Sequence, residues 1–262
     1  MKSRFLLSLF LSSALALGQG IVIENDDSGD DQWISCAATS VFDNLPDGQA
    51  VTVSMWVNVS STAPEHAAGV GQFVTKANAS PVDGWFVGYQ LNANAFLRVN
   101  RRHSVGALYK QWSPGSLLTD QWMHLYTVIP AGIDWEDVDL FRNGSAPTCC
   151  NGFQDAAGSY NADDANLLQI GADPASPSDR GMHGQIACVA IWVGAGSEED
   201  ADALYSIGRE RCSPALFQWT SLGAPLLLLE AIGAFGSTSP AFVDRVGNCI
   251  ASVNGAVELE VD

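Results

Sequence analysis

Basic residues are scarce in this chain. It has 12 Lys and Arg against 29 Asp and Glu in 262 residues, which gives a formal net charge of -17 at pH 7. A protein surface that binds nucleic acid needs a basic patch that neutralises phosphates, and electrostatic binding to anionic lipids needs positive charge as well. The composition therefore argues against nucleic-acid binding and against charge-driven attachment to a membrane.

Several catalytic and metal-binding patterns are also missing. The sequence has no Gly-x-Ser-x-Gly elbow, no His-Glu-x-x-His pair and no Cys-x-x-Cys pair. These patterns mark an activated serine, a zinc protease helix and a zinc or redox site respectively. The acids Glu136 and Asp139 are three residues apart rather than two and no second Glu follows, so a solvated strand edge explains them better than the paired carboxylates of a glycosidase do. No catalytic residue is predicted.

The beginning of the chain has the layout of a secretory signal peptide. Lys2 and Arg4 precede an apolar run over residues 5–17, and Ala16 and Gly18 supply small residues at a cleavage position. The run of about 13 residues is shorter than the ~20 that span a bilayer. We expect residues 1–18 to be a signal peptide and residues 19–262 to be a single extracellular domain; an uncleaved leader or a first strand is the alternative.

Cysteine usage agrees with export. The six cysteines are Cys36, Cys149, Cys150, Cys188, Cys212 and Cys249. We expect disulfides among them, because disulfides persist in oxidising compartments. A bridge between the neighbours Cys149 and Cys150 is strained and is set aside, whereas the remaining connectivity stays open. A metal cluster and free buried thiols are the alternatives, and the absence of zinc-ligand spacing counts against the metal cluster.

Short strands with alternating polarity dominate the pattern. In residues 50–57, Val51, Val53, Met55 and Val57 share one face of a strand. The other expected strands are residues 73–76, 84–91, 96–100, 122–129, 138–142, 167–171 and 185–193. Tight reversals are expected at residues 92–94 and 142–144, where Asn and Gly tolerate positive φ. Many short strands with short connections predict an all-β, two-sheet antiparallel sandwich of the jelly-roll type.

One short helix is expected near residues 197–208. Ser197 is an N-cap followed by three acids in the first turn, and the helix should end by Gly208. The apolar run 226–229 fits either a buried strand or a buried helical turn. The tail over residues 244–259 is predicted as two strands around Asn254-Gly255.

Several segments resemble one family when they are taken in order. They are VTVSMWV (51–57), WMHLYTV (122–128), LFRNG (140–144), LQIG (168–171), GQIACVAIW (184–192) and the Leu204-Tyr205 pair. Their order and spacing resemble the laminin-G-like branch of the concanavalin A-like lectin/glucanase superfamily over roughly residues 33–208. The chain departs from this pattern at Ala187-Cys188, where family members usually carry an acidic pair.

The resemblance implies a two-sheet jelly roll but no particular activity, because this fold carries lectins, adhesion modules, hydrolases, lyases and virion proteins. Members of the laminin-G-like branch often hold calcium at the rim of the sandwich. Of the 29 acids, 20 are Asp and most lie in loops, where oxygen ligands for a hard cation are available. We take Asp173 and Asp179 as the calcium candidates. The alternative role of these acids is solubility.

Exposed aromatic rings would offer a platform for sugars. Trp112 and Trp135 stand in loop-like sequence and are the ligand-binding candidates, whereas the tryptophans in expected strands are assigned to the core. These strand tryptophans are Trp56, Trp85, Trp122 and Trp192. His124 is expected to be a buried imidazole rather than a general base. A basic and aromatic group fits either the wall of a polysaccharide lyase or a local offset to the acidic charge; its members are Arg98, Arg101, Arg102, His103 and Tyr109.

The sequence therefore predicts a secreted, non-catalytic module that binds a glycan or an extracellular protein through rim loops, with calcium as a candidate cofactor. One alternative is a coat or decoration protein that assembles as a homo-oligomer or particle. Another is a polysaccharide hydrolase or lyase. Residues 209–262 are either closing strands of the sandwich or an assembly surface.

Overall fold

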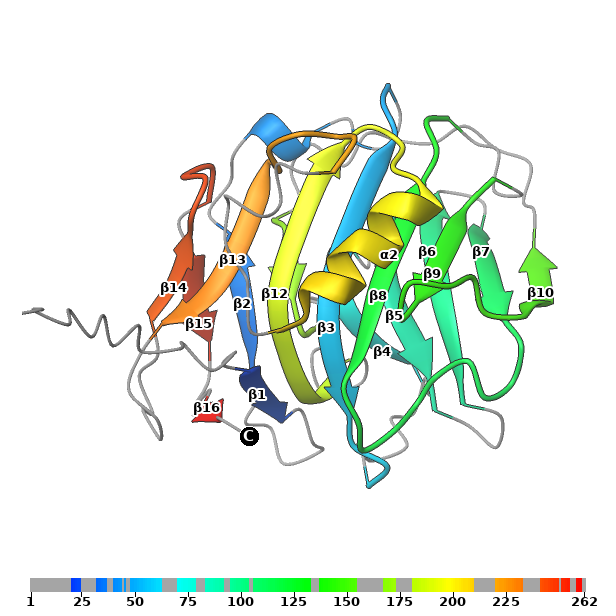
Figure 1. Ribbon diagram of the computed structural model, residues 1–262, viewed down its shortest axis with the longest axis horizontal. Coiled ribbons are helices and arrows are strands. Elements are labelled where there is room, and N and C mark those ends of the chain that lie inside the picture. Colours follow the sequence, from blue (N-terminus) through cyan, green and yellow to red (C-terminus); the bar gives the residue numbers. More distant parts are fainter. Residues whose placement is uncertain are drawn as a thin grey trace, which may run out of the picture.

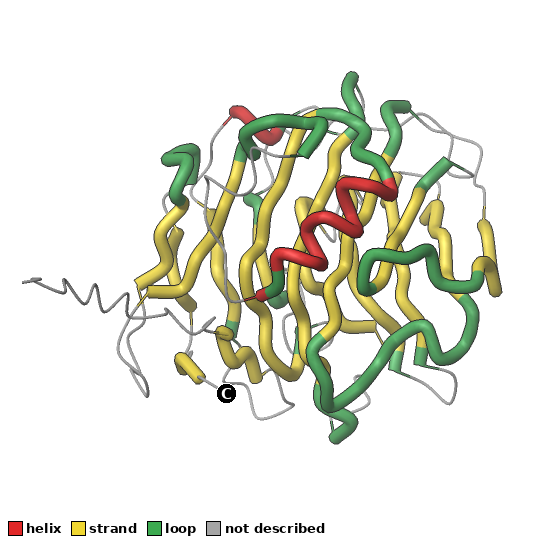
Figure 2. Tube along the Cα trace, in the orientation of Figure 1, coloured by secondary structure: helices red, strands yellow, loops and turns green. Residues whose placement is uncertain are grey.

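Two antiparallel sheets lie face to face, and one helix crosses the outside of one of them (Figure 1, Figure 2). The computed structural model describes residues 20–24, 32–36, 40–43, 45, 48–62, 70–78, 83–91, 95–103, 106–132, 137–154, 167–172, 181–209, 220–232, 241–249, 251–254 and 258–260. The predicted all-β sandwich with one short helix is confirmed. No helix among these residues is long and apolar enough to cross a membrane.

Sheet A has the strand order β14-β13-β12-β3-β8-β9, and β1 and β16 extend it beside β12. Its strands are β1 (Gly20–Glu24), β3 (Val51–Val59), β8 (Met123–Ile129), β9 (Asp139–Arg142), β12 (His183–Val193), β13 (Leu227–Ile232), β14 (Ala241–Asp244) and β16 (Glu258–Glu260). The ambiguous apolar run 226–229 therefore forms most of a strand, β13. The central strand β3 pairs with β12 and β8 along most of its length.

Sheet B has the strand order β10-β7-β6-β5-β4-β11-β2-β15. Its strands are β2 (Trp33–Cys36), β4 (Val70–Asn78), β5 (Asp83–Gln90), β6 (Phe96–His103), β7 (Gly106–Trp112), β10 (Cys149–Gln154), β11 (Gln169–Ile170) and β15 (Ala251–Asn254). A short 3-10 helix, η1 (Ser40–Phe42), follows β2. Strands after residue 208 join both sheets, since β13, β14 and β16 lie in sheet A and β15 lies in sheet B.

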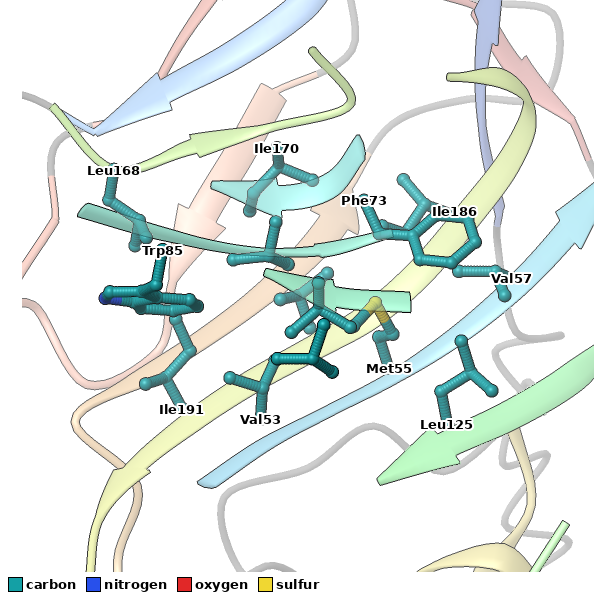
Figure 3. Close-up of a cluster of buried hydrophobic side chains, with 14 of the residues drawn as sticks. Val53, Met55, Val57, Phe73, Trp85, Leu125, Leu168, Ile170, Ile186 and Ile191 are labelled. Atoms are coloured by element: carbon teal, nitrogen blue, oxygen red, sulfur yellow. The ribbon is translucent and has the colours of Figure 1, made fainter. Parts of the chain in front are cut away.

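The main core lies between the two sheets. Strict alternation along β3 turns Val53, Met55 and Val57 inward, where they face Phe73 and Trp85 from sheet B (Figure 3). All of these side chains are buried, and burying one such side chain stabilises a fold by roughly 1.5–3 kcal/mol. The period-two pattern of the sequence is therefore the main reason that these strands form a sandwich.

A second, smaller core lies between sheet A and the helix α2 (Glu198–Ile207). Leu204 and Ala201 of α2 pack on Tyr126 and Trp192 of sheet A. The helix prediction is confirmed in detail, because Ser197 is the N-cap and forms a reciprocal capping box with Asp200. Strands β3 and β8 are consequently covered on both faces over part of their length.

The predicted reversal at Asn143-Gly144 is confirmed. Both residues have positive φ, 53° and 78°, which Asn and Gly tolerate. The Asn143 side-chain oxygen accepts the backbone N–H of His124 at 2.8 Å, and the Asn143 N–H donates to the His124 carbonyl at 2.9 Å. The other predicted reversal, residues 92–94, lies outside the described residues, as does the leader.

A disulfide joins Cys36 at the end of β2 to Cys249, which lies 213 residues later in sequence. Cys188 is also disulfide-bonded. The expected disulfides are thus confirmed for these three cysteines, and the alternatives of a metal cluster and of free thiols are wrong for them. Cys149 and Cys150 form the start of strand β10, whereas Cys212 lies outside the described residues.

Candidate functional site

The outer face of sheet B carries a row of mostly polar side chains. Cross-strand pairing aligns one residue from each of its eight strands, in the order Ser252, Ser35, Gln169, Thr75, Phe86, Asn100, Tyr109 and Gln154. Their chain neighbours Val74, Val87 and Val99 point into the main core. Because successive side chains on a strand alternate between faces, the polar row must face away from that core.

The outer face of sheet B also carries partly exposed side chains on strands β5, β6 and β7. Gln90, Arg98, Tyr109 and Gln111 are half-buried there. The guanidinium carbon of Arg98 lies 4.3 Å from the centre of the Tyr109 ring, and Nη1 of Arg98 donates to Oε1 of Gln90 at 3.4 Å. Arg98 pairs across the strands with Gln111, and Asn100 pairs with Tyr109. We call these five residues, Gln90, Arg98, Asn100, Tyr109 and Gln111, the Arg98 site.

Asn100 gives this site a buried acceptor. Its side chain is only 5% exposed, and its Oδ1 accepts no hydrogen bond from any residue that the structure describes. The Gln169 side chain, three strands away in the same row, has an acceptor of the same kind. A buried polar atom without a partner costs about 1–3 kcal/mol. Because Oδ1 of Asn100 is closed to solvent, Asn100 lies at the base of the site, and the half-buried side chains around it are the ones that a ligand can contact.

The Arg98 site combines an aromatic ring, a guanidinium and three amides. Such a set can contact the apolar face of a ring and exchange several hydrogen bonds with hydroxyl groups. Its described side chains include no carboxylate and no imidazole, which are the usual groups for general acid–base catalysis. The arrangement suits the binding of a ligand that has both an apolar face and hydroxyl groups.

One pair in sheet A has the composition of a nucleophile and its base. The hydroxyl of Ser54 lies 2.9 Å from Nε2 of His124, but the two residues are only 2% and 1% exposed. Burial lowers the pKa of His124 to about 3, so the imidazole is neutral. The rings of Trp56 and Tyr205 lie 5.3 Å and 6.3 Å from His124. The predicted buried imidazole is confirmed, and substrate cannot reach the pair.

The prediction that Trp112 offers an exposed ring is wrong. Trp112 is the last residue of β7 and is 2% exposed in the main core, with Nζ of Lys110 5.7 Å from its ring centre. Since Tyr109 and Gln111 face outward, strand alternation turns Lys110 and Trp112 inward. The loop-like composition around Ser113-Pro114-Gly115 led to the prediction of a loop at Trp112, which is in fact the end of a strand.

The remaining site predictions are untested. Trp135, Asp173 and Asp179 lie outside the described residues, so a sugar contact at Trp135 and a calcium site at the two aspartates stay predictions. Within the described part of the chain, no three His, Cys, Asp or Glu side chains gather closely enough to hold a metal ion.

The core assignment of the strand tryptophans is correct for two of the four. Trp85 and Trp192 are buried, but Trp56 and Trp122 are half-buried on the outer face of sheet A. Because side chains on a strand alternate between its two faces and Met55 and Val57 point inward, Trp56 points away from the main core.

The amides of the Arg98 site were not predicted from the sequence. The spacings Arg98-x-Asn100 and Tyr109-x-Gln111 nevertheless place each pair on one face of a strand.

Known structures share this fold at low sequence identity. A heptameric SAP-like pentraxin from Limulus polyphemus has a TM-score of 0.54 and 14% identity, over 92% of this chain and 96% of that chain. A protein from Bacteroides ovatus whose proposed role is carbohydrate binding has a TM-score of 0.54 and 13% identity, over 94% of this chain and 60% of that chain. Tailspike protein 2 of Escherichia coli O157:H7 bacteriophage CAB120 has a TM-score of 0.51 and 11% identity, over 82% of this chain and 27% of that chain. These similarities establish the fold alone.

No curated protein matches the chain in sequence. The family model described as concanavalin A-like lectin/glucanases superfamily matches residues 28–201, which is well over half of the chain. Eleven of the sixteen described strands lie within this match. The chain therefore belongs to the concanavalin A-like lectin/glucanases superfamily.

Proposed function

We propose that this protein is a saccharide-binding module and that the saccharide lies against the outer face of sheet B, at the Arg98 site. The observation that carries the proposal is the juxtaposition of the half-buried Tyr109 ring and Arg98 guanidinium with the half-buried amides of Gln90 and Gln111. The fold neighbour from Bacteroides ovatus, with its proposed role in carbohydrate binding, supports the class of ligand but not the site.

The chemistry of a sugar ring matches this set of groups. A pyranose has an apolar C–H face that can lie on the Tyr109 ring and hydroxyl groups around its edge. Its hydroxyl groups can accept from the Arg98 guanidinium or from the side-chain amides of Gln90 and Gln111, and can donate to the oxygens of these amides. Each such hydrogen bond contributes about 0.5–1.5 kcal/mol net, so three of them together with the ring contact give weak binding, with a dissociation constant of about a millimolar.

The proposal includes export of the protein. The disulfide between Cys36 and Cys249 supports an oxidising compartment, since disulfides are rare in reducing cytosol. It agrees with the signal peptide expected over residues 1–18. Calcium dependence, with Asp173 and Asp179 as ligands, remains a separate prediction that the same experiment can decide.

The test is a glycan array probed with the purified protein, once with millimolar calcium and once with EDTA. We expect hits that persist in EDTA and that disappear with Tyr109→Ala. Arg245→Ala is the control, because Arg245 is exposed on the loop after β14 and belongs to no part of the site. Hits that vanish in EDTA but survive Tyr109→Ala would show that the glycan binds at the predicted calcium site and not at the Arg98 site. Silence in both arms would overturn saccharide binding.

A further inference from the structure

A second set of outward-facing rings lies on the opposite side of the sandwich. Trp56 on β3 and Trp122, the residue that precedes β8, are half-buried on the outer face of sheet A. In Figure 1 the helix α2 crosses the upper part of this face and leaves the lower ends of β12 and β3 uncovered. Asn58 pairs with Gln185 across these uncovered ends. We call Trp56, Asn58, Trp122 and Gln185 the Trp56 face.

The two rings contact residues at the end of the helix α2 and just after it. The Tyr205 ring is stacked on Trp56, with centres 5.8 Å apart and planes at 26°, and the Arg209 guanidinium lies 4.2 Å from the centre of the Trp122 ring. Trp56 also contacts the buried His124 ring. Because these side chains are fixed before any ligand arrives, binding on this face would cost little ordering entropy.

Amides complete the face. Nδ2 of Asn58 donates to Oε1 of Gln185 at 3.1 Å, which orients both side chains beside the rings. Oδ1 of Asn58 accepts no hydrogen bond from the described part of the chain. Aromatic rings with amides at their edge are the same combination that the Arg98 site offers to a sugar.

The open area favours a small ligand over a protein. Tyr205 is 38% exposed and both tryptophans are half-buried. At roughly 150–250 Å² for each aromatic side chain, the three rings leave on the order of 200 Å² open. A standard protein interface buries about 800 Å² from each partner, so the rings are too small to anchor one by themselves. A single sugar ring needs far less.

Charge on α2 narrows the ligand further. Glu198, Glu199 and Asp202 are exposed on the helix that borders this face, and Asp202 lies one turn from Tyr205. Nearby carboxylates repel anionic groups over a distance of about 8–10 Å at ordinary ionic strength. Arg209 beside Trp122 opposes this repulsion with one positive charge, but the three carboxylates outnumber it and the chain as a whole carries a formal charge of -17. The balance of charge therefore favours a neutral sugar over a uronate or a sulfated sugar.

We infer that the Trp56 face is a second saccharide site, for a neutral sugar. The inference of two sites rests on the proposed function of the Arg98 site. The two sites lie on opposite outer faces of a two-layer sandwich whose sheets are ~10 Å apart, so one sugar ring cannot occupy both. The chain is then bivalent and bridges two saccharide chains.

Affinity electrophoresis against a panel of polysaccharides tests this inference. The protein is run through native gels that contain soluble β-glucan, mannan, xylan, arabinan, galactan or the acidic polymer alginate. The variants are Arg98→Ala with Tyr109→Ala for the Arg98 site, and Trp122→Ala for the Trp56 face. Arg245→Ala is the control. If Trp122→Ala does not fold, as judged by thermal unfolding, Gln185→Ala replaces it because it removes an amide and keeps both rings.

We expect a neutral polysaccharide to retard the wild-type protein, and each set of substitutions to weaken retardation by about tenfold without abolishing it. Light scattering on protein mixed with that polysaccharide should show large cross-linked particles for wild type and none for either variant. If only the Arg98 and Tyr109 substitutions matter, the second site is wrong and the proposed function stands.

The other outcomes are equally decisive. If only Trp122→Ala matters, the Trp56 face binds and the placement of the ligand on sheet B is wrong. Retardation by alginate that depends on Trp122 would overturn the assignment to neutral sugars. A wild-type protein that no polysaccharide retards would overturn both sites.

Discussion

Nε2 of His124 lies 2.9 Å from the Ser54 hydroxyl, and the backbone of His124 is held at both its N–H and its carbonyl by Asn143. The imidazole is therefore hydrogen-bonded to β3, whereas the backbone of His124 is fixed by the reversal after β9. It lies beneath α2, in contact with Trp56 and Tyr205. The histidine is a structural link in the second core rather than part of a catalytic site.

This link makes stability depend on pH. Burial lowers the pKa of His124 from 6.5 to about 3 in the folded protein. The unfolded chain binds the proton at higher pH, so the free energy of unfolding should decrease as pH falls from about 6.5 towards 3, by on the order of 4 kcal/mol. Urea unfolding at several pH values should show a steeper decrease for wild type than for His124→Gln. Parallel curves would contradict this account.

Asp200 joins the start of α2 to the following loop. Its carboxylate accepts the Ser221 N–H at 2.7 Å, the Ser221 hydroxyl at 2.6 Å and the Ser197 N–H at 3.0 Å. Desolvation raises the pKa of Asp200, but these hydrogen bonds outweigh it and leave the pKa below the ordinary value. We expect Asp200→Ala to lower the free energy of unfolding by about 1–3 kcal/mol. Asp202→Ala, an exposed acid on the same helix, should change it by less than about 0.5 kcal/mol.

The Cys36–Cys249 disulfide closes most of the chain into one loop. Its removal by the double substitution Cys36→Ser and Cys249→Ser should destabilise the fold by about 2–5 kcal/mol, because the unfolded chain gains conformational freedom. Chemical unfolding of the double variant measures this directly and leaves the bond at Cys188 intact. An unchanged unfolding midpoint would show that the bridge contributes nothing.

Gly184 allows close approach of β12 and β3. It has φ of 146°, and a Cβ atom built on it would lie 2.1 Å from the Asn58 carbonyl oxygen. Gly184→Ala must push the two strands apart, so we expect a loss of more than about 2 kcal/mol. Gly48→Ala is the matched control, because no atom lies within 4 Å of a Cβ there. Equal melting temperatures for the two variants would refute the explanation.

Tyr109 should matter through its ring rather than its hydroxyl. Loss of the ring in Tyr109→Ala removes both the sugar contact and the platform for Arg98, so the dissociation constant for an array-identified glycan should rise about tenfold or more. Tyr109→Phe keeps the ring and should stay within about threefold of wild type. Calorimetric titration of both variants provides the comparison, and equal effects would point to the hydroxyl instead.

Local sequence patterns predicted the fold well because the relevant forces are local or periodic. The alternation in β3 identifies its core face, and Ser197 with Asp200 identifies the start of α2 through hydrogen bonds between residues three apart. The run 226–229 was ambiguous for the opposite reason. Its strand identity depends on pairing with β12, more than 30 residues earlier, which no local pattern records.

The candidate sites were harder to predict because they depend on which face each strand end presents. Polar and turn residues after Trp112 suggest an exposed ring, yet the alternation of side chains along β7 turns this ring into the core. The apolar strand around Trp56 suggests a buried ring. The alternation of side chains along β3 instead turns the Trp56 ring outward, where α2 covers it only in part. The Arg98 site is assembled by pairing three strands, and only the register shows that its amides lie together.

The most direct test of saccharide binding on sheet B is an NMR titration of isotope-labelled protein with the strongest glycan from the array. We predict that the backbone amide shifts that change most belong to β5, β6 and β7, with Arg98, Asn100, Tyr109 and Gln111 among them. A smaller group of changes at Trp56 and Gln185 would agree with the second site. Changes that leave β5, β6 and β7 unaffected would contradict the central claim.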